Sequence, residues 1–143
     1  MYKFDTLYLM NKGSESPGLV YNWQGKRILI VEDDYVNYLF FHEILSFSYA
    51  CLIRAVSLQE AFDMLASGNR FDLVIINTAI PGNENCRSVK RMKLLWPHIR
   101  VVAISGCECA DRCFPTGCDT MISRDIDSYD MCNMVNEMFY PLN

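Results

Sequence analysis

Five polar side chains stand directly after apolar runs of the sequence, where their chemistry could be combined. In chain order they are Glu32, Asp33, Asn77, Ser105 and Arg124. If the apolar runs are parallel strands, their carboxyl ends meet at one edge, which is where open α/β sheets bind their ligands. Two acids, an amide, a hydroxyl and a cation would then face one crevice. The set predicts a binding or catalytic site whose central residue, Asn77, follows the most apolar run.

The elements that must position these side chains alternate regularly along the chain. Short β-branched runs, each bounded by polar or turn residues, predict strands, and segments with apolar residues at helical spacing separate them. The expected strands cover residues 28–31, 52–56, 73–76, 101–104 and 118–122. Such alternation predicts right-handed βαβ crossovers. The expected fold class is therefore α/β, a single five-stranded parallel sheet with helices on both faces.

Two of the expected helices have recognisable starts, and the helix after the first strand has apolar residues on more than one side. Ser57 and Glu60 form a capping box, and Asp127 caps the last helix. After the first strand, one apolar stripe runs from Val36 to Phe47, and a second stripe lies beside it. This helix is either buried on more than one side or carries an apolar face for a partner. The fourth helix, expected across residues 108–114, is short or irregular because Pro115 follows.

Composition excludes several classes of protein. The chain has 143 residues, a net charge of −4 and no basic run, which argues against nucleic-acid binding. The longest charge-free apolar run, residues 44–53, is too short to cross a membrane, and the N-terminus lacks the features of a signal peptide. We expect a cytoplasmic protein with an arm or linker at residues 1–23, one domain at 24–143, and seven reduced cysteines.

Four motifs together resemble a known family. They are Ile-Leu-Ile-Val-Glu-Asp-Asp from residue 28, Asp-Leu-Val-Ile-Ile-Asn from 72 with a following Pro-Gly, Val-Val-Ala-Ile-Ser from 101, and Gly-Cys-Asp-Thr-Met-Ile-Ser-Arg from 117. Their order and strand-end positions resemble the receiver domains of two-component response regulators, which have a chemotaxis-type, flavodoxin-like (βα)5 fold. The resemblance covers residues 24–140.

The resemblance implies a phosphoryl transfer. In receivers of this kind an Asp at the position of Asn77 attacks a kinase phosphohistidine, and Mg²⁺ is held partly by the acid at the position of Asp33. A Ser or Thr and a Lys bind the phosphoryl oxygens, so Glu32, Asp33 and Ser105 fit the pattern. Asn77 and Arg124 depart from it, because a neutral amide cannot form a useful acyl phosphate and a guanidinium is larger than an ammonium group.

These departures predict a degenerate phosphoryl site with no catalytic residue. With one carboxylate fewer, Glu32 and Asp33 would hold Mg²⁺ weakly at best, so no cofactor is required. Arg124 could pair with either acid and take the place of the metal. We therefore expect a pseudo-receiver in phosphorelay signalling that is not an enzyme and acts by binding proteins. A histidine kinase, a phosphotransfer domain or another regulator is the expected partner, and a homodimer is possible.

Two alternatives remain open at this point. The domain could still be regulated by phosphate, either on a neighbouring acid such as Asp34 or after deamidation of Asn77. The less favoured alternative is a metal or redox sensor, because Cys107, Cys109, Cys113 and Cys118 fall close together. Their spacing matches no defined metal motif.

Overall fold

The computed structural model describes residues 21–105 and 117–141. Five parallel strands form one sheet in the order β2-β1-β3-β4-β5. Their bounds are β1 Arg27–Val31, β2 Cys51–Ala55, β3 Leu73–Asn77, β4 Arg100–Ser105 and β5 Thr120–Ser123. β3 lies at the centre and is buried along its whole length. The predicted fold class, a single five-stranded parallel sheet, is confirmed.

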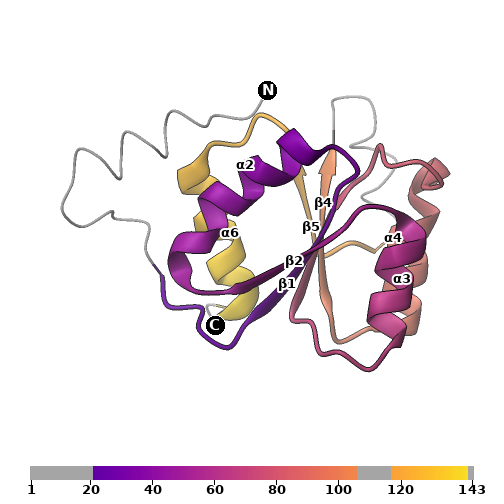
Figure 1. Cartoon of the computed structure of the whole chain (residues 1–143), viewed down its shortest axis with the longest axis horizontal. Coiled ribbons are helices and arrows are strands. Elements are labelled where there is room, and N and C mark those ends of the chain that lie inside the picture. Colours follow the sequence, from indigo (N-terminus) through magenta and orange to yellow (C-terminus); the bar gives the residue numbers. More distant parts are fainter. Residues whose placement is uncertain (1–20, 106–116, 142–143) are drawn as a thin grey trace.

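Helices cover both faces of the sheet. Figure 1 shows α2 and α6 on one side of the strands and α3 and α4 on the other. The α-helices of the described residues are α2 Tyr35–Leu45, α3 Leu58–Ala66, α4 Arg87–Leu95 and α6 Ser128–Phe139, with the short 3-10 helices η1 Ser46–Ser48 and η2 Glu84–Cys86. Two apolar clusters result, one under α2 and α6 and the other under α3 and α4. The sheet therefore separates two half-cores.

Short polar side chains set the helix starts as the sequence predicts. Ser57 Oγ accepts a hydrogen bond from the Glu60 N–H at 3.1 Å, and Glu60 Oε1 accepts one from the Val56 N–H at 2.9 Å. Asp127 Oδ1 accepts from the Asp130 N–H at 2.8 Å. Asp34 caps α2 in the same way, through the Val36 N–H. These bonds satisfy backbone donors that the first turn of a helix leaves unpaired.

The helix after β1 matches its predicted pattern only in part. Phe40 and Ile44 from the first stripe are buried, and so are Phe41 and Leu45 from the second. Val36, however, is 67% exposed, and Phe47 lies beyond the end of the helix in η1 and is 42% exposed. α2 is thus buried on more than one side near its C-terminus, where it packs on the sheet, and exposed at its start.

Trp23 belongs to the core, although the predicted boundary assigned it to the arm. Its ring is fully buried among residues of α2 and α6. Trp23 Nε1 donates to Asn136 Oδ1 at 3.0 Å, and the ring of Tyr21 stacks on it. A sequence pattern could not show this, because a lone tryptophan before a Gly-containing turn has no periodicity. Of the described residues, no helix is long and apolar enough to cross a membrane. The helix expected at 108–114 lies outside them.

Candidate functional site

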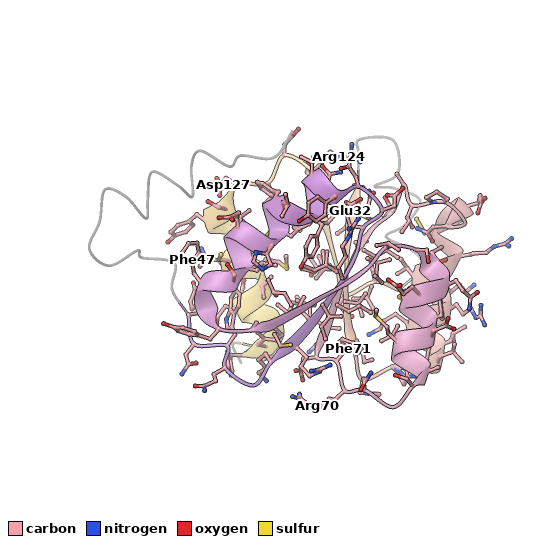
Figure 2. The ribbon with its side chains drawn as sticks, in the orientation of Figure 1. Glu32, Phe47, Arg70, Phe71, Arg124 and Asp127 are labelled. Atoms are coloured by element: carbon pink, nitrogen blue, oxygen red, sulfur yellow. The ribbon has the colours of Figure 1, made fainter. Side chains whose placement is uncertain are left out.

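The register of the sheet brings the predicted residues to one edge, with Asp33 next to Glu32 in the loop after β1. Val31 pairs with Ile76, so Glu32 follows β1 beside Asn77 at the end of β3. Asn77 pairs with Ile104, which places Ser105 next along the edge. Arg124 follows β5, and its backbone N–H donates to the Ser105 carbonyl at 3.1 Å. Figure 2 shows Glu32 and Arg124 at the same end of the strands, with Arg70 and Phe71 at the opposite end.

Glu32 and Asn77 form the closest contact of the site. Asn77 Nδ2 lies 3.2 Å from Glu32 Oε1 and 3.1 Å from Glu32 Oε2, so the amide donates to the carboxylate. The Asp34 N–H donates to Glu32 Oε2 at 3.1 Å. Glu32 is fully buried and Asn77 is 7% exposed. The carboxylate is therefore held by neutral donors in a place that water hardly reaches.

The orientation of the Asn77 amide follows from its partners. Asn77 Oδ1 accepts from the Ala79 N–H at 2.9 Å, which requires an oxygen at that position. The carboxylate of Glu32 in turn requires a donor, which only the amide nitrogen supplies. Both polar atoms of the Asn77 amide thus have a partner of the complementary kind. An aspartate in the same rotamer could keep the Ala79 bond, but its second oxygen would face the oxygens of Glu32.

Burial raises the pKa of Glu32 above its usual range. Hydrogen bonds from the Asp34 N–H and the Asn77 amide favour the charged form and oppose this shift, whereas the nearby Asp33 adds to it. Within the described ranges, 21–105 and 117–141, no ion pair reaches Glu32. The site therefore holds a carboxylate that is costly to ionise.

Arg124 does not replace a metal ion by pairing with the acids, which the sequence had suggested as an option. Among the described residues its guanidinium makes no ion pair, and Arg124 Nε is buried without a hydrogen-bond partner. Ser105 beside it is also buried. The backbone thus places Arg124 at the correct edge, but its charge does not reach Glu32 or Asp33.

Sequence reasoning missed a second cation near the site. Arg54 of β2 donates from Nε to the Glu32 carbonyl at 3.1 Å and from Nη2 to the Asp33 carbonyl at 3.2 Å. Its guanidinium also lies over the rings of Tyr35 and Tyr38, at 5.3 Å from each centroid. Arg54 therefore fixes the acidic loop through its backbone. A charged residue inside an otherwise apolar strand was the available signal.

The side chains of the site do not fit a tight Mg²⁺ site, the metal that the resemblance implies. Both oxygens of Glu32 accept from the Asn77 nitrogen, which cannot itself bind a cation. Asp33 is exposed at the edge of the site, and Asp34 is engaged as the cap of α2. Mg²⁺ prefers a near-octahedral set of oxygen ligands, which would need Asn77 to turn away from Glu32.

The cysteine cluster lies mostly outside the described residues, which include Cys118 but not Cys107, Cys109 or Cys113. Burial raises the pKa of the Cys118 thiol, and the charge of Asp119 adds to this, so the thiolate that metals require is disfavoured. No group of three potential ligands gathers within the described parts of the chain. Cys86 is in a disulfide, which corrects the expectation that all seven cysteines are reduced.

Comparisons with known proteins agree with the geometry. A family model described as the response regulator receiver domain matches residues 28–136. Sporulation initiation phosphotransferase F of Bacillus subtilis (strain 168) is 30% identical over 81 residues, which are 57% of this chain and 64% of that protein. The chain thus matches less than two thirds of the length of this relative.

Solved structures of similar fold come from several organisms. A CheY-like response regulator receiver domain protein from Methanospirillum hungatei JF-1 has a TM-score of 0.70 and 22% identity, and the match covers 78% of this chain and 91% of that one. A response regulator receiver domain protein from Clostridium thermocellum has a TM-score of 0.71 and 18% identity, covering 79% and 93%. At these identities the likeness shows the fold alone.

Proposed function

Since the chain belongs to the response regulator receiver domain family of two-component signalling, we propose that it is a pseudo-receiver. In this proposal the domain keeps the receiver fold, forms no aspartyl phosphate, catalyses no reaction and acts by binding other proteins. The observation that carries the proposal is the bidentate contact between the Asn77 amide and the buried Glu32 carboxylate.

The contact opposes phosphorylation in two ways. A carboxylate nucleophile forms its acyl phosphate by donating an oxygen lone pair to phosphorus, and the phosphohistidine nitrogen leaves with the electrons of the broken P–N bond. An amide oxygen is a far weaker nucleophile, and in Asn77 it already accepts from the Ala79 N–H. The amide nitrogen meanwhile covers the carboxylate that would help to hold Mg²⁺, so we expect weak Mg²⁺ binding at best.

The two phosphate-dependent alternatives receive less support from the local structure. Deamidation would need the Thr78 nitrogen to attack the side-chain carbonyl of Asn77, but the Thr78 N–H donates to the Ile104 carbonyl at 2.9 Å. Asp34 is occupied as the helix cap. The Thr78 nitrogen and the Asp34 carboxylate, which would have to react, are therefore both engaged in other hydrogen bonds.

Phosphorylation by a small phosphodonor with Mg²⁺ tests the proposal directly. We expect no adduct on the wild-type chain by intact mass spectrometry, a small gain with Asn77→Asp, and a larger gain with Asn77→Asp combined with Arg124→Lys. Digestion and sequencing of any adduct would locate it and would also reveal deamidation of residue 77. An acid-resistant, base-labile phosphate on wild-type protein would refute the proposal.

Protein partners are the proposed output. The relative from Bacillus subtilis is described as a phosphotransferase of sporulation initiation, which supports a phosphorelay setting. A histidine kinase, a phosphotransfer domain or another regulator is the partner class that fits a receiver fold without its nucleophile. Self-association is the competing outcome, and light scattering across a concentration series separates a homodimer from a monomer that binds other proteins.

A further inference from the structure

A groove lies between α3 and α4 and reaches the Pro81-Gly82 turn that follows β3, but neither Glu32 nor Asn77 lines it. It has a volume of about 810 Å³ and is lined on the α3 side by Leu58 and Phe62, and on the α4 side by Arg87, Arg91 and Leu95. Figure 1 shows the two helices side by side on one face of the sheet. The groove is therefore a feature of the helix layer and not part of the phosphoryl site.

The floor of the groove is apolar and aromatic. The rings of Phe62 and Trp96 lie 5.8 Å apart, and the guanidinium of Arg91 lies 4.8 Å from the centroid of the Phe62 ring. Leu95 is 52% exposed and the adjacent Leu94 is 73% exposed. Apolar side chains of a partner that covered this surface would be removed from water, which is the main source of affinity in helix-in-groove complexes.

The α4 wall of the groove is cationic. Arg87 and Arg91 line it, and the same helix also carries Lys90 and Lys93, which do not line it, and no acid, in a chain whose net charge is −4. Only Lys93 among these four has an ion pair within the described residues, with Asp119. The sequence shows no basic run because these cations are spaced, and the helix gathers them. Arg87 also stands in the first turn, where the helix dipole disfavours a cation.

The opposite wall differs in charge. Asp63 of α3 lines the groove, and its Oδ1 accepts from Gln59 Nε2 at 2.9 Å. An acidic ligand would therefore be attracted to the α4 side and repelled from the α3 side. The charge pattern selects a ligand with an apolar face and acids along one flank.

We propose that this groove binds an acidic amphipathic helix of a protein partner, with its apolar face on Phe62 and Leu95 and its acidic flank against Arg87 and Arg91. The proposal rests on the proposed function in that it supplies a surface for partner binding. The apolar floor favours a peptide over a nucleic acid, because phosphates would gain only from the cations and would leave the floor uncovered.

The test uses a synthetic helical peptide of about 15–18 residues, long enough to form a helix, with leucines on one face and glutamates on the other. Amide chemical shifts of the full chain are followed by NMR at physiological salt. We expect shifts concentrated on α3 and α4 and none with a peptide in which lysines replace the glutamates. Shifts centred on other elements, or no shifts at all, would overturn the proposal.

Two neighbouring cations provide a matched pair of variants. Arg91 lines the groove, whereas Lys90 is exposed on the same helix and does not line it. We expect Arg91→Glu to weaken peptide binding by about tenfold or more and Lys90→Glu by about twofold, since net charge changes equally in both. Equal losses would mean that general charge attraction alone explains binding. Tighter binding of single-stranded DNA than of the acidic peptide would also overturn the proposal.

The outcome is independent of the phosphorylation result. Peptide binding is measured on wild-type protein without phosphodonor. If the peptide does not bind in the groove, only the groove proposal is refuted. A wild-type aspartyl phosphate would refute the pseudo-receiver proposal whatever the peptide does.

Discussion

The environments of two carboxylates, buried Glu32 and half-buried Asp119, differ at the two ends of the sheet. At the carboxyl edge, Glu32 is held by an amide and a backbone N–H, and its pKa is raised. At the amino edge, burial raises the pKa of Asp119, but Lys93 at 2.8 Å, the Val101 N–H and the charge of Arg100 outweigh this effect and lower it. Asp119 thus has its counter-charge built into the chain, whereas Glu32 does not.

This difference in pairing indicates which of the two carboxylates, Asp119 or Glu32, stabilises the fold. A paired acid such as Asp119 joins α4 to the start of β5 and stabilises the fold. An acid with only neutral donors adds little to stability, and here it stands at the edge that we propose is a degenerate phosphoryl site. The variants below change one edge at a time, in order of decreasing expected effect.

Asn77→Asp should have the largest effect, because it would put a second carboxylate about 3 Å from Glu32 in place of a donor. We expect the free energy of unfolding, measured by urea denaturation at neutral pH, to fall by about 3 kcal/mol without metal. Mg²⁺ should restore much of this loss and stabilise wild type far less. Asn77→Ala, which removes the bond without adding charge, is the control. Equal stabilisation of wild type and Asn77→Asp by Mg²⁺ would contradict the inference that the Asn77 amide prevents Glu32 from holding Mg²⁺.

Lys93→Met should come next, at about 1–2 kcal/mol of lost stability, because it leaves the Asp119 charge half-buried without its close partner. Arg100→Ala is the matched variant, since Arg100 lies 3.5 Å from the same carboxylate but is 45% exposed, and should cost about 0.5 kcal/mol or less. Denaturation of both at neutral pH measures the difference. Equal costs would show that Lys93 is not the dominant partner.

The pH dependence of stability should have opposite signs at the two edges. The folded state binds a proton on Glu32 more tightly than the unfolded state, so Glu32 lowers stability as pH rises from the usual glutamate pKa through the raised one. Asp119 contributes stability above the usual aspartate pKa, and this is lost as pH falls through its lowered pKa.

Glu32→Gln isolates the first of these slopes. The variant should lose the decline on the alkaline side of the glutamate range. The slope with pH is the readout and not the absolute stability, because the amide nitrogen of the new side chain would face a donor, either Asn77 Nδ2 or the Asp34 N–H. Denaturation midpoints across pH 4–8 provide the measurement, with Glu43→Gln as a control for an exposed acid on α2. A wild-type curve that rises through this range in step with Glu32 ionisation would reverse the assignment.

Arg54→Lys should have the smallest effect, about 0.5 kcal/mol, because an ammonium group can keep one of the two carbonyl contacts and part of the stacking on Tyr35 and Tyr38. We expect faster hydrogen exchange at the Asp34 amide, which reports on the acidic loop. Unchanged exchange would show that the acidic loop keeps its structure without the two hydrogen bonds from the Arg54 guanidinium.

Periodicity and strand-end polarity were enough to predict the sheet, the parallel direction of its strands and the edge that holds Glu32, Asp33, Asn77, Ser105 and Arg124. These features depend on local patterns of apolar and polar residues, which can be read directly from the sequence. The direction of the Asn77 amide, the position of the Arg124 guanidinium and the bonds of Arg54 depend on side-chain packing between strands far apart in sequence. The burial of Trp23 and the pairing of Lys93 with Asp119 could not be predicted for the same reason.

The segment before β1 is fastened to the last helix of the domain. Trp23 bonds to Asn136, the hydroxyl of Tyr21 bonds to Asn133, and the hydroxyl of Tyr140 bonds to the Asn22 carbonyl, so residues at the two ends of the described chain share one set of contacts. A tensile load applied to the chain at residue 21 would therefore be carried first by α6 in shear, and not by peeling β1 from the sheet. In a pulling experiment, Trp23→Ala should lower the force at which the domain yields from that end, while the force from a handle in the loop before α3 stays unchanged.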